Sequence, residues 1–150
     1  MKDGDIYLCK LLEKAGWHEG RKLNYEYISE MVGTEGYAQM PNVISFLQEF
    51  LDIKILFKNK RNGLKNDDIN FSFKEATNLV VPERINEDYA QRIGKEICLI
   101  GSAYREHMVL MMSNDGFVYA GYDNFLCKVA DSGNEAIKSI IYDYDFVTIP

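Results

Sequence analysis

The chain has 150 residues, of which 47% are hydrophobic, so it can bury the core of one domain over residues 1–150. No apolar run approaches the ~20 residues of a membrane span, and no secretion signal opens the chain, so we expect a cytoplasmic protein without a membrane partner. The net charge of −6 is uneven, since residues 66–150 sum to −7, and this acidity argues against nucleic-acid binding.

The first predicted helix begins near Asp3 or Asp5, either of which can cap a helix start. Gly16 suits the left-handed residue that ends many helices, and the only tryptophan, Trp17, follows it. We expect the Trp17 ring to fold back over the helix end. Arg21 would then stack on the indole or bond the last carbonyls of this helix. The helix presents one apolar stripe: Leu8, Leu11, Leu12 and Ala15.

Two more helices and a hairpin are expected next. The second helix covers Tyr25 to Val32 and is broken by Gly33 and Gly36, whereas the third has Pro41 in its first turn. The third helix carries the clearest helical stripe of the chain, made of Val43, Phe46, Leu47 and Phe50. The period then changes to alternation, which predicts strands at residues 53–58 and 69–74 joined by a loop of about ten residues.

The loop of this hairpin contains two charged groups. Basic residues surround the Asn62-Gly63 turn, and we interpret them as a solvated cluster: Lys58, Lys60, Arg61 and Lys65. The pair Asp67-Asp68 is a candidate for acid–base chemistry, but its position in a loop favours two solvated carboxylates.

A helix capped by Asn86 and a buried strand at residues 97–100 open the second half of the chain. Gly94 and Gly101 are spaced for turns on either side of that strand. The strand pattern contains Cys98, and we expect all three cysteines to be small buried hydrophobes in a reducing compartment: Cys9, Cys98 and Cys127.

A second hairpin joins residues 107–113 to residues 117–122 through Asn114-Asp115-Gly116, a strong turn signal. A closing helix starts near Ser132, and a last strand covers residues 146–149. The helix turns four apolar residues inward: Ala136, Ile137, Ile140 and Ile141. Helices followed by antiparallel strands, with two later helices, predict an α+β domain whose mostly antiparallel sheet has helices packed mainly on one face.

In this order, the pieces resemble the third subfamily of the SUKH superfamily of bacterial immunity proteins. The motifs are Gly16-Trp17 with Arg21, an Ile-Gly segment that ends at Gly101, and a hairpin that reads Asp-Gly-x-Val-Tyr from Asp115 to Tyr119. The resemblance runs from about Leu8 to Tyr142. It implies the SUKH architecture and a cognate protein toxin domain as partner, whose active site the protein would block. A nuclease is one candidate toxin, because the acidic second half fits a basic partner.

Nothing in the sequence forms a catalytic or metal-binding motif. The two histidines, His18 and His107, lack metal-ligand spacing. A Cys98/His107 dyad is conceivable, but Cys98 lies among apolar residues, which raise a thiol pKa and leave the group inert. No nucleophile elbow or phosphate-binding glycine loop occurs. We therefore expect a protein that is not an enzyme and binds neither a metal nor a cofactor.

The stretch Tyr142-Asp143-Tyr144-Asp145 alternates aromatic and acidic side chains. One interpretation is the entry into the last strand, with the tyrosines packed on the core. The other is a partner-binding surface, since tyrosines are frequent anchors and carboxylates steer basic partners. The candidate toxin-binding residues are then Asp115, Tyr119, Tyr122, Asp123, Tyr142, Asp143, Tyr144 and Asp145.

Two classes of function remain open from the residues alone. The first is toxin neutralisation. The second is a non-catalytic interaction or regulatory module of the same fold without a toxin partner. In either case we expect a monomer or a weak homodimer.

Overall fold

The computed structural model describes residues 5–60 and 63–150 and confirms the α+β class. The sheet has seven strands, each antiparallel to its neighbours and ordered as in the chain, β1-β2-β3-β4-β5-β6-β7. In chain order the elements are α1 (Ile6–Lys14), α2 (Tyr25–Thr34), α3 (Pro41–Phe50), β1 (Lys54–Asn59), β2 (Lys65–Asn70), α4 (Phe73–Thr77), the π-helical η2 (Arg84–Tyr89), α5 (Ala90–Ile93), β3 (Ile97–Ala103), β4 (Met108–Ser113), β5 (Val118–Tyr122), β6 (Phe125–Ala130), α6 (Gly133–Ile141) and β7 (Val147–Thr148). Among the described residues, no helix is long and apolar enough to cross a membrane.

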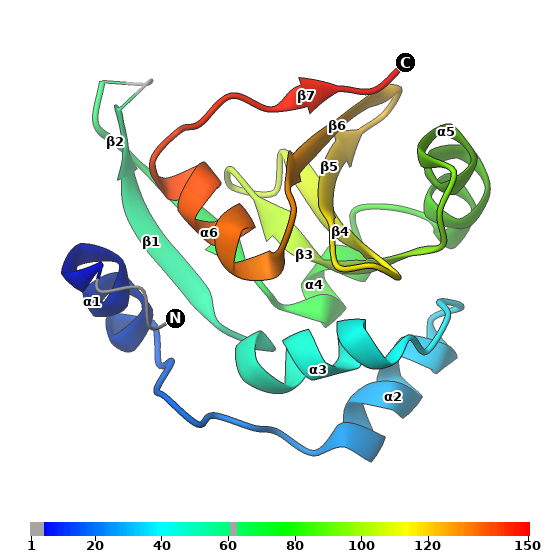
Figure 1. The fold of residues 1–150 in the computed structure, drawn as a ribbon, viewed down its shortest axis with the longest axis horizontal. Coiled ribbons are helices and arrows are strands. Elements are labelled where there is room, and N and C mark those ends of the chain that lie inside the picture. The colour runs from blue at the N-terminus through cyan, green and yellow to red at the C-terminus, as the bar shows by residue number, and fades with distance from the viewer. Residues whose placement is uncertain (1–4, 61–62) are drawn as a thin grey trace.

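The sheet curves around α6, which lies inside the bend, while α5 lies to the right of the sheet in Figure 1. α6 touches α3, because a Cβ on Gly133 would meet the Phe46 ring. It also reaches the start of α1, because the Tyr142 hydroxyl donates to Asp5 at 2.6 Å. These contacts gather α1, α3 and α6 into one group against the sheet. η2 meets β5, where the Tyr89 ring lies over Gly121.

Asp5 and Gly16 lie at the two ends of α1 as expected. The Asp5 side chain accepts from the Leu8 amide at 3.0 Å and caps the helix, whereas Asp3 lies outside the described residues. Gly16 adopts a left-handed φ of 102°. Trp17 is buried, with 7% of its surface exposed, and its Nε1 donates to Glu49 Oε2 at 2.9 Å. The indole therefore links the segment that follows α1 to α3.

Arg21 bonds the carbonyls at the end of α3 and not those of α1. Its two Nη atoms donate to Glu49 O at 2.5 Å and to Leu51 O at 2.7 Å. Of the two expectations for Arg21, the one in which it bonds the last carbonyls of the first helix was therefore wrong. The extended segment after Trp17 carries the guanidinium to α3, whose last carbonyls need donors.

α2 continues through Gly33 to Thr34. We expected Gly33 to break this helix, but it serves close packing. A Cβ at Gly33 would lie 2.7 Å from Gln39 Nε2, and that amide donates to Ser29 O across the helix. α3 begins at Pro41 as predicted, and its stripe is buried except for the half-buried Phe46.

The second strand of the first hairpin ends earlier than the alternation predicts. β2 stops at Asn70, whose side chain accepts from the Ser72 amide at 3.0 Å. Ser72 then caps α4, so Phe73 begins a helix and is not a strand residue. The predicted strand at residues 69–74 and its ten-residue loop were wrong, because β2 starts at Lys65.

Because β2 pairs with β1 from Lys65 onward, two acidic residues of this hairpin lie in a strand and not in the expected loop. Asp67 and Asp68 lie in β2 and are buried, so the predicted solvated loop pair was wrong. Lys58, Lys60 and Lys65 are exposed as expected. Arg61 of the basic cluster lies outside the described residues.

In the second half, Asn86 lies inside η2 and caps nothing, because its side chain donates to Gly36 O at 2.9 Å. Gly94 ends α5 with a φ of 80°, as expected. The second hairpin and the Ser132 cap of α6 are confirmed. β6 was not anticipated. It pairs with β5 and β7, and the last strand is limited to β7.

Candidate functional site

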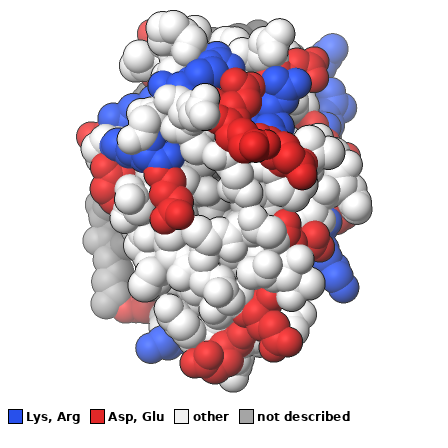
Figure 2. Space-filling model, turned by 90° about the vertical axis from the view of Figure 1, so that its right-hand side faces the viewer, with Lys and Arg blue, Asp and Glu red and all other residues white. Residues whose placement is uncertain are grey.

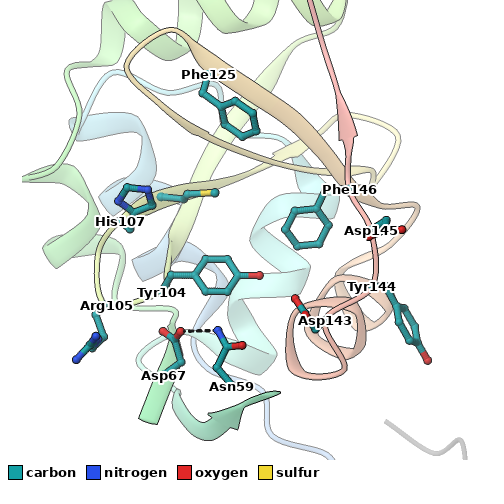
Figure 3. Close-up of a pocket in the computed structure, with 11 residues that line it drawn as sticks. Asn59, Asp67, Tyr104, Arg105, His107, Phe125, Asp143, Tyr144, Asp145 and Phe146 are labelled. Carbon is teal, nitrogen blue, oxygen red and sulfur yellow. Dashed lines mark hydrogen bonds between the residues drawn. The ribbon is translucent and has the colours of Figure 1, made fainter. Parts of the chain in front are cut away.

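A cavity of about 620 Å³ opens where the ends of β1, β2 and β4 meet the segment between α6 and β7 (Figure 3). It is lined by Asn59, Asp67, Tyr104, Arg105, His107, Met108, Phe125, Asp143, Tyr144, Asp145 and Phe146. Its volume is within the range of pockets that bind small molecules or side chains of a partner. We call it the aromatic–acidic cavity.

The turn between β3 and β4 forms one wall of this cavity. Tyr104, Arg105 and Glu106 have left-handed φ values of 58°, 54° and 67°. Each such residue costs roughly 1–2 kcal/mol, so this conformation persists only where the surrounding structure holds it. Asp68 provides that constraint, since its carbonyl accepts from the Tyr104 amide at 2.9 Å and its carboxylate from the Arg105 amide at 3.1 Å.

We expect Asp68→Ala to lower the free energy of unfolding by about 1–3 kcal/mol, because it removes the acceptor of the Arg105 amide and the partner of Lys54. Asp68→Asn keeps an acceptor oxygen and should cost less. Urea unfolding of both variants measures the difference. Equal losses would show that the lost charge, and not the amide contact, sets the cost.

The side chains that enter the aromatic–acidic cavity come from distant parts of the chain. Figure 3 shows the rings of Tyr104, Phe125 and Phe146 projecting into it from different walls, while Arg105 points away. On the floor, Asn59 donates to Asp67 Oδ2 at 2.9 Å, and both side chains are buried. Of these residues, only Asp67 is a candidate from the sequence, where it was expected in a solvated pair. The only local sequence signal for this wall is the polar run 104–106 between two apolar strands.

Three sequence-predicted residues, Asp143, Tyr144 and Asp145, line this cavity. Asp143 follows the end of α6 with a left-handed φ of 58°, and its carboxylate lies beside Tyr104 and Asn59 in Figure 3. Tyr144 is 49% exposed and points away from the cavity in Figure 3. The Tyr144 ring and the Asp143 carboxylate therefore turn to different sides.

Tyr142 is half buried and belongs to a tyrosine cluster next to α1. Its ring centroid lies 6.1 Å from that of Tyr144 and 6.3 Å from that of Tyr7. The hydrogen bond to Asp5 raises the pKa of Tyr142 to about 12. Tyr142 thus packs on the core side, as the first interpretation of this stretch expects, whereas Tyr144 remains accessible.

Two more predicted residues, Tyr122 and Asp123, line an adjoining cavity of about 530 Å³. His107 borders both cavities. Its ring centroid lies 4.4 Å from that of Tyr122, which lies 5.2 Å from that of Phe125. These three rings form a ridge between the cavities, and Tyr122 is 38% exposed there.

The remaining predicted residues, Asp115 and Tyr119, lie elsewhere. Asp115 is in the turn between β4 and β5, whose glycine, Gly116, has a φ of 90°. Hydrogen bonds from Lys95 and Ser113 lower the pKa of Asp115 to about 2. Tyr119 is only 3% exposed and offers no ring to a partner in this structure. The eight candidates therefore do not form one patch.

The dyad considered from the sequence is not assembled. Cys98 pairs with Met112, five residues beyond His107 along the strand direction, which corresponds to about 16 Å. Burial raises the pKa of Cys98 to about 12 and that of Cys127 to about 11. Cys9 is only half buried, contrary to expectation. No group of three potential metal ligands occurs in residues 5–60 and 63–150.

Residues 8–143 match the family described as SUKH-3 immunity protein. No curated protein and no solved structure matches the chain.

Proposed function

The chain belongs to the SUKH-3 immunity protein family, and we propose that it neutralises one cognate bacterial toxin by covering the active site of the toxin without a covalent step. The family assigns the protein to toxin immunity. The non-covalent mechanism, the toxin-binding face and a basic nuclease as the toxin are parts of the proposal. The observation that carries it is the family match over residues 8–143.

The two adjoining cavities support a protein-binding role for their face. They combine exposed aromatic rings, such as Tyr122 and Tyr144, with carboxylates at Asp123, Asp143 and Asp145. Aromatic anchors inside a polar rim are typical of protein interfaces. Because residues 66–150 carry a net charge of −7, they would attract a basic toxin electrostatically.

A mostly uncharged surface is an alternative candidate for the toxin-binding site. Figure 2 shows the side that lies at the right of Figure 1, with charged residues gathered along its upper and lower parts and mostly uncharged surface between them. Low charge at the centre of a face also suits a protein interface. We favour the cavities because named rings and carboxylates meet there.

We expect purified protein to inhibit the cognate toxin in proportion to its amount, with complete inhibition near one molecule per toxin. A toxin separated from the complex under denaturing conditions and refolded should regain its activity, because no bond was changed. Co-expression should restore growth of cells that produce the toxin. Inactivation of many toxin molecules by one molecule of this protein, or a change in toxin mass, would contradict the proposal.

A further inference from the structure

We propose that the turn between β3 and β4, residues 104–107, is the central recognition element of the toxin-binding face, and that the Arg105 guanidinium pairs with a carboxylate of the toxin. This inference rests on the proposed function and specifies one contact of the complex. It goes beyond the cavities, because it assigns that contact to the segment at which they meet.

All four residues of this turn border a cavity. Tyr104, Arg105 and His107 line the aromatic–acidic cavity, whereas Glu106 and His107 line the adjoining one. The turn therefore lies where the two cavities meet, in the middle of the face for which we propose toxin binding. Residues near the centre of an interface are shielded from water by the contacts around them, and the strongest contacts cluster there.

The backbone of the turn favours a binding role. Its first three residues, Tyr104, Arg105 and Glu106, have left-handed φ values of 58°, 54° and 67°. Glycine or asparagine adopts this conformation more easily, yet the chain has larger side chains at all three positions. Costly backbone conformations of this kind are concentrated at binding sites, where they fix side chains in advance.

The shape of the turn is held from the neighbouring strand. Asp68 of β2 accepts from the Tyr104 amide through its carbonyl and from the Arg105 amide through its carboxylate. Asp68 is itself buried, with 8% of its surface exposed. The turn therefore has little backbone freedom to lose when a partner binds, which favours affinity.

The Arg105 side chain is accessible to a partner. It is exposed, and it points away from the aromatic–acidic cavity in Figure 3. Within residues 5–60 and 63–150, its guanidinium has no hydrogen bond or ion pair, since only its amide is bound. A guanidinium presents a planar fork of donors that matches a carboxylate, and arginine is frequent among the residues that dominate binding energy. Because the proposed partner is a protein, the complementary group is the carboxylate of an aspartate or glutamate.

Toxin binding by Arg105→Asn tests the inference. Asparagine tolerates the left-handed φ, so the urea midpoint of this variant should equal or exceed that of the wild type. Its Kd should nevertheless rise by about 30-fold, as for an arginine at the centre of an interface. Arg105→Lys keeps the charge but not the planar fork, so its Kd should fall between the two. A purely structural role of the guanidinium would instead lower the urea midpoint.

Lys22→Asn is the control matched in charge. Lys22 is exposed and lines neither cavity, so this variant should bind like the wild type. Each of the two asparagine variants makes the protein more acidic by one charge, which strengthens long-range attraction to a basic toxin. Weaker binding by Arg105→Asn therefore reports the loss of a direct contact and not a change in overall charge.

The toxin side of the contact is found by replacing its aspartates and glutamates one at a time by alanine. One of these changes should weaken binding to the wild type but not to Arg105→Asn. If the wild type binds the toxin and Arg105→Asn binds as tightly as Lys22→Asn, the inference is wrong and the proposed function stands. Absence of such a toxin carboxylate, or a lower urea midpoint of Arg105→Asn, would also overturn the inference. A wild type that does not bind the toxin would overturn both.

Discussion

Trp17→Ala should lower the free energy of unfolding by about 3–5 kcal/mol, the range for truncation of a large buried aromatic side chain. The ring is 7% exposed, directly follows the end of α1 in the chain and donates its N–H to Glu49 of α3. Its removal leaves a cavity and takes the donor away from Glu49. Urea unfolding followed by far-ultraviolet circular dichroism measures the loss, since the variant has no tryptophan for fluorescence.

Two companion variants separate the causes of this loss. Trp17→Phe keeps most of the apolar contact but no N–H donor, so it should fall between the wild type and Trp17→Ala. Tyr27→Ala removes a ring that is 62% exposed and should change stability by less than about 0.5 kcal/mol. A loss below ~1 kcal/mol in Trp17→Ala would mean that the motif does not hold the two helices together.

The elements that the sequence predicts correctly are those with local causes. Asp5 and Ser132 cap the helices that follow them, and Pro41 begins α3. The turn around Gly116 joins β4 to β5. Each signal acts within a few residues of its position, so no knowledge of the rest of the fold is needed.

The errors arise where a cap, a close contact or strand pairing overrides the periodic pattern of the sequence. Alternation continues past Asn70, but the Asn70 side chain accepts from the Ser72 amide and the Ser72 hydroxyl accepts from the Glu75 amide, so a helix begins there. Gly33 lies inside α2, where its missing side chain leaves room for Gln39. Asp67 and Asp68 look like solvated residues in the sequence, yet strand pairing with β1 buries them.

Some residues of the candidate site can be identified from the sequence, whereas others are brought together only by the fold. Asp143 and Asp145 were found because their alternation with tyrosines is visible in the sequence, and the structure places them at the aromatic–acidic cavity. Tyr104, Phe125 and Phe146 carry no shared local signal, because only the tertiary fold brings their rings together. Tyr119 matches the family motif but points into the core. A residue of the family motif is therefore not necessarily a residue of the binding surface.

Gly101 is structurally required, but for a different reason from the one that the sequence suggests. We expected it to make a turn, but it lies inside β3 at a shift in the pairing with β4 and has no left-handed φ. A Cβ at Gly101 would lie 2.5 Å from the Asn70 carbonyl oxygen and 3.1 Å from Phe71 Cα. The glycine is needed because β2 passes too close for any side chain.

Gly101→Ala should therefore destabilise the protein by about 3 kcal/mol, at the upper end of ordinary overpacking, because the clashing atoms belong to the backbone and cannot rotate away. Gly116→Ala is the matched control. Gly116 has a φ of 90° and open space around its Cα, so only backbone strain of about 1–2 kcal/mol is expected. Urea unfolding of the two variants gives the comparison, and a larger loss at Gly116 would contradict the packing argument.

Gly101→Ala should also change the shape of the proposed toxin-binding cavity. Relief of the clash requires β2 to move away from β3, and β2 carries Asp67 and Asp68. Asp68 holds the turn of Tyr104, so a shift of β2 displaces that ring as well. We expect the folded variant to bind the toxin more weakly than Gly116→Ala when both are measured under conditions where each is fully native. Equal affinities would show that the 104–106 turn keeps its shape without the close approach of the two strands.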